Sequence, residues 1–296
     1  MVIGTPIERL ALYFAAIRTR QGILARAALG APDAGDATLA DALATRLAAE
    51  LRPDGSVGGA TVPTIWRAHE LLDLGRGPDH PAVVQVLGWV MERQGKPGAY
   101  GEGCDKTRHA QQLCEHWVRG FFAPAAAAER LTPITLPIGK VFRAEPAARF
   151  AISCLALRAA LRAGLRDRPA IVQHLESVRE LAGQWTGWSG FFAPDVIVAG
   201  LHAMALGGPD YRESVATLVT MVAAHQGPDG LWPNADVFAA LDALLSTDLP
   251  AAHAAVRRAV PALVERQRID GTLGTTAQQE RALIGLRALL WAETTP

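Results

Sequence analysis

The sequence has few cysteines, no excess of charge of either sign and no long apolar run. The three thiols, Cys104, Cys114 and Cys154, are too few for the disulfide framework of small secreted domains, so we expect a reducing compartment, the cytoplasm. Lys and Arg number 29 and Asp and Glu number 29, so no overall field attracts nucleic acid or an anionic membrane. No stretch of about 18 uninterrupted apolar residues occurs, which predicts no transmembrane segment. We therefore expect a soluble protein with no nucleic-acid partner.

Strand patterning is also missing. No segment alternates apolar and polar residues strictly, whereas apolar residues recur at helical spacing, as at Leu39, Leu43, Leu47 and Leu51. With 296 residues, 50% of them hydrophobic, the chain can bury a large core. The pattern predicts one all-α domain over residues 1–296.

A glycine-rich turn recurs along the chain. Copies begin at Leu51 (LRPDGSVGG), Arg93 (RQGKPGAYGEG), Gly183 (GQWTGWSGFF), His225 (HQGPDGLWPN) and Arg266 (RQRIDGTLG). Glutamines at 184, 226 and 267 are 42 and 41 residues apart, and the 90 residues from 94 to 184 leave room for one more copy near 139. The proline- and glycine-rich LTPITLPIGKVF from Leu131 lies there, so we count six copies.

Each copy joins two expected helices. The first set covers 37–51, 80–94, 124–131, 168–184, 211–226 and 250–267. The second set covers 61–74, 105–120, 146–163, 194–206, 235–246 and 276–292. One extra helix over 6–29, within residues 1–30, precedes them. The chain is thus expected to form six helix hairpins and an N-terminal helix.

The two sets differ in charge. VIVAGLHAMAL after Asp195 and VFAALDALL after Asp236 carry few charges, whereas RESVATLVTMVAAHQ and HAAVRRAVPALVERQ carry more. Helices that are apolar on nearly all sides belong inside a ring, and helices with one solvated face belong outside it. The asymmetry favours closure into an (α/α)6 toroid over an open superhelix.

The clearest copy combines QGPDGLW from Gln226 with DVFAALDALL from Asp236. This pair resembles the repeat of the terpenoid cyclase and protein prenyltransferase toroid superfamily, with glycine-rich turns similar to QW motifs. The resemblance implies a closed ring, an axial cavity and an isoprenoid or other apolar small-molecule substrate.

Carboxylates recur where the second helices begin, at Asp105, Glu145, Asp195 and Asp236. Capping a helix is the ordinary role of each, but a cluster around one cavity indicates that at least one does more. Class II terpenoid cyclases protonate an alkene with the middle Asp of D-x-D-D. Here Asp236 has that place in NADV, with Asn234 and Val237 in place of two acidic partners. Asp236 is therefore the first candidate acid, with Asp195 next.

The stretch GCDKTRHAQQLCEHW places Asp105, His109, Gln112 and His116 on one helix face. Asp105 could orient His109 as an acid or base. Alternatively, Asp105, His109 and His116 could hold a divalent metal such as zinc. A structural polar network is the third interpretation. The zinc ligands of prenyltransferases are not matched, because Gln112 stands where their Asp would precede Cys114.

Aromatic and basic residues near the turns are candidates for substrate binding. They are Trp66, Tyr100, Trp188, Phe191, Trp232, Arg143 and Arg149. The aromatic rings either line the cavity and stabilise a cation or pin the turns onto neighbouring helices. The two arginines either bind a phosphate or pair with Glu145. His202, on an apolar helix, is expected to be a satisfied core histidine.

We predict a terpenoid-cyclase-like enzyme, a cyclase, isomerase or lyase, that uses acid or acid/base chemistry. A metal-dependent enzyme of the same fold is the first alternative. A non-catalytic toroid that binds a lipid or a partner protein is the second. A glycan hydrolase or lyase, which would need two opposed carboxylates in a groove, is the third.

Overall fold

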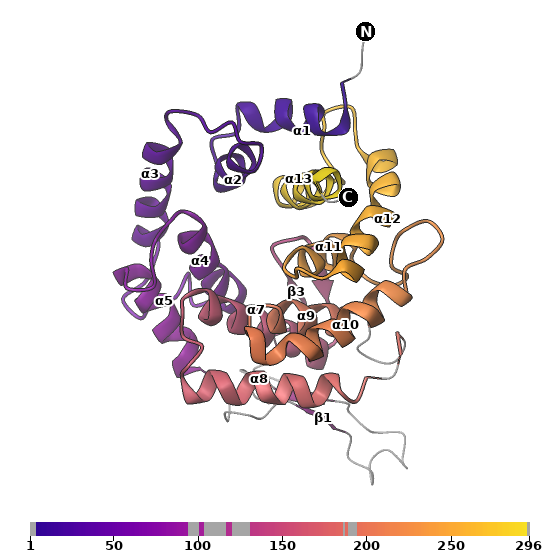
Figure 1. Cartoon of the computed structure of the whole chain (residues 1–296). Helices are drawn as coiled ribbons and strands as arrows, with labels where there is room; N and C mark the ends of the chain where they lie inside the picture. The colour runs from indigo at the N-terminus through magenta and orange to yellow at the C-terminus, as the bar shows by residue number, and fades with distance from the viewer. Residues whose placement is uncertain are drawn as a thin grey trace.

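The computed structural model describes residues 4–93, 101–103, 117–119, 131–185, 187–188 and 194–294. Within these residues, two concentric sets of helices form a ring (Figure 1). The outer helices are α1 (Pro6–Ala15), α3 (Asp36–Ala49), α5 (Pro81–Glu92), α8 (Pro169–Ala182), α10 (Arg212–Ala224, after a 3₁₀ turn at Pro209–Tyr211) and α12 (Pro250–Arg266). The inner helices are α2 (Arg20–Ala28), α4 (Thr61–Asp73), α7 (Glu145–Arg162), α9 (Asp195–Met204), α11 (Val237–Leu245) and α13 (Gln278–Thr294).

The inner helices close on themselves. Each packs against the next in the order α2, α4, α7, α9, α11 and α13, and α13 packs against α2. The predicted all-α (α/α)6 toroid is confirmed.

The helices that form the six hairpins differ from the sequence prediction at the N-terminus. The single helix expected over 6–29 is two helices, α1 and α2, which form one of the six hairpins rather than an addition to them. Leu10 and Phe14 of α1 are fully buried in a cluster with α13, so this hairpin contributes core as the others do.

The second difference is an insertion between α5 and α7. The inner ring passes directly from α4 to α7, so residues 93–144 separate the two helices of one hairpin. The helix expected over 105–120 is wrong at its end, where β2 (Trp117–Arg119) pairs antiparallel with β1 (Gly101–Gly103). Residues 105–116 and 124–130 lie outside the described residues, and Leu131 is not helical.

The supposed turn copy near 139 is likewise part of the insertion. There β3 (Ile134–Thr135) pairs antiparallel with β4 (Val141–Phe142). We call residues 131–144 the cover segment, because they lie over the cavity described below.

The glycine-rich turns fit against the next outer helix around the ring. Gly230 has φ +78°, and a Cβ there would lie 2.0 Å from the carbonyl oxygen of Arg258 in α12. Gly271 has φ +84° and makes the same kind of approach to α1, where a Cβ would lie 2.6 Å from the carbonyl oxygen of Arg9. Only glycine combines a left-handed conformation with such an approach.

In each of these two turns, the glutamine forms a hydrogen bond with the same outer helix that the glycine approaches. Gln226 Nε2 donates to the Ala255 carbonyl in α12 at 2.8 Å. Gln267 Nε2 donates to the Pro6 carbonyl at 3.0 Å, and Gln267 Oε1 accepts from Arg9 Nε at 2.9 Å. The contact that joins α10 to α12 is thus repeated between α12 and α1, which closes the outer ring. Among the described helices, none is long and apolar enough to span a membrane.

Candidate functional site

A cavity lies beside the cover segment, between four of the inner helices. The lining residues come from the cover segment and from α4, α7, α9 and α11: Trp66, Leu136, Pro137, Ile138, Lys140, Phe142, Ala151, Cys154, Leu155, Arg158, Asp195, Val198, Ala199, His202, Ala239 and Asp242. Most of these side chains are apolar, so the cavity suits an apolar ligand.

Three contacts hold the cover segment onto the inner helices. The Glu145 carboxylate at the start of α7 accepts from the Leu131 and Thr132 amides at 2.9 and 3.0 Å. Burial works in the opposite direction, but these amides and Arg149 hold the pKa of Glu145 below its usual range. Lys140 Nζ lies 2.8 Å from Asp195 Oδ2.

The third contact comes from Arg281 on α13. Arg281 Nε donates to the Ile138 carbonyl at 2.8 Å, and its Nη2 lies 2.9 Å from Asp236 Oδ2. The other oxygen of Asp236 caps α11 by accepting from the Phe238 and Ala239 amides at 3.0 and 3.2 Å. Asp236 is therefore joined to the cover segment through Arg281.

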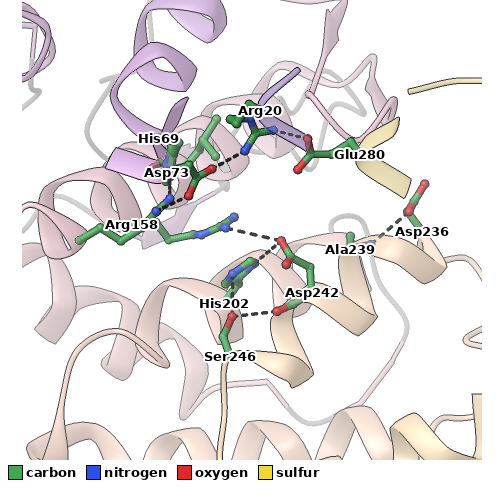
Figure 2. A network of polar contacts seen from close by, with 12 residues as sticks. Arg20, His69, Asp73, Arg158, His202, Asp236, Ala239, Asp242, Ser246 and Glu280 are labelled. Carbon is green, nitrogen blue, oxygen red and sulfur yellow. Dashed lines mark hydrogen bonds and ion pairs between the residues drawn. The ribbon is translucent and has the colours of Figure 1, made fainter. Parts of the chain in front are cut away.

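The cavity has one polar corner, formed by Arg158, His202 and Asp242 (Figure 2). Asp242 Oδ2 lies 3.6 Å from Arg158 Nη2 and 3.7 Å from His202 Nδ1. Both distances exceed those of hydrogen bonds. The charged and polar groups of this corner therefore lie close together without forming hydrogen bonds to one another.

Ser246 fixes the proton on His202. Ser246 Oγ donates its single proton to the Asp242 carbonyl at 2.8 Å, so it accepts from His202 Nε2 at 3.0 Å. Burial, reinforced by Arg158, lowers the pKa of His202 well below 6.5, so the ring is neutral. Nδ1 therefore carries a lone pair that faces the Asp242 carboxylate.

This arrangement differs from a nucleophilic Ser–His–Asp triad. The Ser246 hydroxyl already donates its proton to the Asp242 carbonyl. Ser246 is also the C-cap of α11, where a helix presents carbonyl oxygens rather than the amide donors of an oxyanion hole.

A second polar group adjoins the corner. Arg20 contacts both Asp73 and Glu280 (Figure 2). Arg162 Nη2 lies 2.5 Å from Asp73 Oδ1. Burial raises the pKa of Glu280, whereas the pKa of Asp73 stays below its usual value, against its own burial, because two arginines contact it.

His69 completes this group. Its Nε2 donates to the Leu155 carbonyl at 3.0 Å, and its Nδ1 accepts from Arg162 at 3.0 Å. Burial, together with Arg158 and Arg162, lowers the pKa of His69 to about 3.

The predicted substrate residues separate into two groups. Trp66 lines the cavity. Trp232 Nε1 donates to the Val222 carbonyl at 2.9 Å, and Trp188 Nε1 donates to the Pro233 carbonyl at 2.8 Å. Neither of these two residues belongs to the cavity lining. Both hold turns in place, which is the second of the two interpretations given for the aromatic residues.

The predicted arginines also lie outside the lining. Arg143 is exposed, and Arg149 is buried with Nε 2.7 Å from Glu145 Oε1. Arg149 therefore supports the ion-pair interpretation. Whether either arginine binds a substrate stays a prediction.

Five predicted site residues lie outside the described residues: Tyr100, Asp105, His109, His116 and Phe191. The zinc hypothesis therefore stays a prediction. Within the part of the chain that the structure describes, no group of three His, Cys, Asp or Glu side chains could hold a metal ion.

The sequence matches no protein-family model and no curated protein sequence. Solved structures do match. The type II terpene cyclase MstE from Scytonema, in a complex with geranylgeranyl dihydroxybenzoate, superposes with a TM-score of 0.57 at 15% identity over 97% of this chain and 88% of its own. The fold is that of a type II terpene cyclase.

Two further structures share this terpene-cyclase fold. A protein from Actinoplanes has a TM-score of 0.58 at 16% identity, covering 97% of this chain and 98% of its own. The ent-copalyl diphosphate synthase from Streptomyces platensis has a TM-score of 0.52 at 17% identity, covering 95% and 50%. At such low identities the likeness concerns the fold.

Sequence reasoning missed Arg158 and Asp242 in this terpene-cyclase fold. A usable signal exists for both. Each is a charged residue inside an otherwise apolar stretch of an inner helix, in CLALRAAL and VFAALDALL. Such a charge faces either a polar partner or a cavity, and here each faces both.

Proposed function

We propose that the protein is a terpenoid-cyclase-like enzyme that isomerises a linear isoprenoid in the axial cavity by acid chemistry. The observation that carries the proposal is a mostly apolar cavity between the inner helices with a carboxylate, Asp195, in its wall beneath the cover segment. The terpene-cyclase fold supports it, and so do the substrate complexes of MstE.

Asp195 is the proton donor in this proposal. Asp195 takes up a proton from water before turnover and adds it to a terminal alkene carbon. The Lys140 ammonium at 2.8 Å then stabilises the carboxylate that remains. The faces of Trp66 and Phe142 stabilise the carbocation while new carbon–carbon bonds form. Loss of a proton from the last cation to the Asp195 carboxylate restores the acid, so the product is an isomer of the substrate.

Asp236 is the competing donor. Both of its oxygens are engaged, one by the α11 amides and one by Arg281, and it does not line the cavity. We therefore place it as a positioning residue that acts through Arg281 on the cover segment.

The test is turnover of linear C15, C20 and C30 isoprenoids in D₂O, followed by gas chromatography with mass spectrometry. We expect a cyclic isomer that gains one deuterium at the initiating carbon, and at least a 100-fold loss in Asp195→Asn. Asp229→Asn is the matched control, because Asp229 only accepts from the Leu231 amide in a turn.

Two results would overturn parts of the proposal. Full activity of Asp195→Asn with loss in Asp236→Asn would transfer the acid to Asp236. Binding of isoprenoids without any product would leave a non-catalytic lipid-binding toroid.

A further inference from the structure

The polar corner of the cavity is electrically balanced. Its cation, Arg158, has a carboxylate partner in the same corner, Asp242, at 3.6 Å. The histidine of the wall, His202, is neutral. The polar corner, as the described residues form it, therefore has no spare positive charge for an anionic ligand.

The polar corner nevertheless has unused hydrogen-bonding capacity. Within the described residues, the Arg158 guanidinium makes no hydrogen bond, and its buried Nε has no partner. Burying such a donor without an acceptor costs about 1–3 kcal/mol. A ligand that brings an acceptor oxygen to the accessible part of this guanidinium would gain a charge-assisted hydrogen bond that no described residue supplies.

Donors are missing at the same place. Asp242 Oδ2 and His202 Nδ1 are both acceptors, they lie 3.7 Å apart, and no proton lies between them because His202 carries its proton on Nε2. The corner therefore offers N–H donors from one side and two acceptors from the other.

We propose that the corner formed by Arg158, His202 and Asp242 binds the hydroxyl group of an uncharged isoprenoid alcohol. The hydroxyl oxygen accepts from the Arg158 guanidinium, and its proton is donated to Asp242 or His202. A carboxylate brings no proton and is repelled by Asp242, and a diphosphate brings several negative charges that the balanced corner does not offset. The inference rests on the proposed function, because it assumes an isoprenoid in this cavity.

This site also orients the ligand. His202 and Asp195 lie on the same inner helix seven residues apart, which is about 10 Å along its axis. A hydroxyl held at His202 directs the hydrocarbon tail toward the cover segment and Asp195, where the proposed acid lies.

The experiment compares four C15 ligands that differ only at one end: farnesol, farnesene, farnesoic acid and farnesyl diphosphate. Their dissociation constants are measured by isothermal titration calorimetry below the concentration at which they aggregate. We expect farnesol to bind at least tenfold more tightly than each of the other three.

Two variants test the named residues. Arg158→Met is expected to weaken farnesol to the level of farnesene and to leave farnesene unchanged, whereas Arg46→Met, an exposed arginine on α3, changes neither. Asp242→Asn removes the repulsion and adds a donor, so the affinity for farnesoic acid should rise at least tenfold. This second variant keeps the test open if Arg158→Met does not fold.

The outcomes separate the two proposals. Equal binding of farnesol and farnesene, or tighter binding of the acid or the diphosphate, would overturn the alcohol site and leave the isoprenoid cavity intact. Failure of all four ligands to bind would overturn both.

Discussion

Gly230 makes the closest contact between neighbouring hairpins, and it allows a quantitative test of the turns. Alanine at this position combines a left-handed φ, which costs roughly 1–2 kcal/mol, with a Cβ that lies 2.0 Å from the Arg258 carbonyl oxygen. We expect Gly230→Ala to lower the free energy of unfolding by about 3 kcal/mol or more, measured by urea denaturation.

Gly75 is the matched control for this prediction. Its φ is also +78°, but a Cβ there meets no atom within 4 Å. Gly75→Ala should therefore show only the conformational cost of about 1–2 kcal/mol. Equal losses in the two variants would mean that contact with the next outer helix contributes nothing.

Buried neutral histidines predict how the protein responds to acid. Burial lowers the pKa of His69 to about 3 and of His174 to about 4, whereas an unfolded histidine titrates near 6.5. Below pH 6.5 the unfolded chain takes up protons that the folded protein does not, so the free energy of unfolding falls as the pH falls toward the folded values.

The slope of this loss identifies the residue. Each such histidine contributes about 1.4 kcal/mol per pH unit once its unfolded form is protonated. Urea denaturation at pH values from 7.5 to 4.5 should give a shallower slope for His69→Gln by about one proton. An unchanged slope would show that His69 is protonated in the folded state.

Single residues could be placed from the sequence more reliably than their roles. The start of an inner helix at Asp236 follows from an aspartate before an apolar run, and the structure has its cap there. Its contact with Arg281 could not be derived, because the partner lies 45 residues away on another helix. Arg158 and Asp242 show the same limit, since a pattern locates a buried charge but not the group opposite it.

Among the elements, the cover segment is held over the cavity by Arg281, Lys140 and Glu145. Arg281→Met removes the donor to the Ile138 carbonyl and the partner of Asp236. We expect faster amide hydrogen exchange over residues 131–144, measured by mass spectrometry, and lower turnover, because water enters the cavity.

Arg287→Met provides the control on the same helix, since Arg287 is exposed and has no ion pair or hydrogen bond in the described residues. Its exchange over 131–144 should match that of the unmodified protein. The role given to Arg281 would be lost if both variants exchanged alike.

The helices themselves were largely predictable. The hairpins α8/α9, α10/α11 and α12/α13 lie where the spacing of the glutamine-containing turns predicts them. The insertion was not predictable from the sequence. The 90 residues between Gln94 and Gln184 equal two periods whether or not they contain another repeat. Proline and glycine in residues 131–142 mark a turn in either case, and only packing distinguishes a β3–β4 pair from a joint between helices.

For the molecule as a whole, closure was expected from the contrast between apolar and charged helices. The partner that closes the ring was not, since the Arg9–Gln267 contact joins residues 258 positions apart. From its sequence alone, the weakly patterned N-terminal segment is interpreted as a helix additional to the six hairpins. It becomes a member of the ring only through what it touches at the other end of the chain.

Closure between α12 and α1 has a consequence for cooperativity. Linear arrays of repeats fray from their terminal units, because those units have one neighbour, whereas every hairpin of this ring has two. We expect one calorimetric transition whose van't Hoff and calorimetric enthalpies agree. Deletion of residues 4–30 would leave Asp73 and Glu280 buried without Arg20, so the shortened chain should lose its transition altogether rather than melt as a ring with one unit fewer.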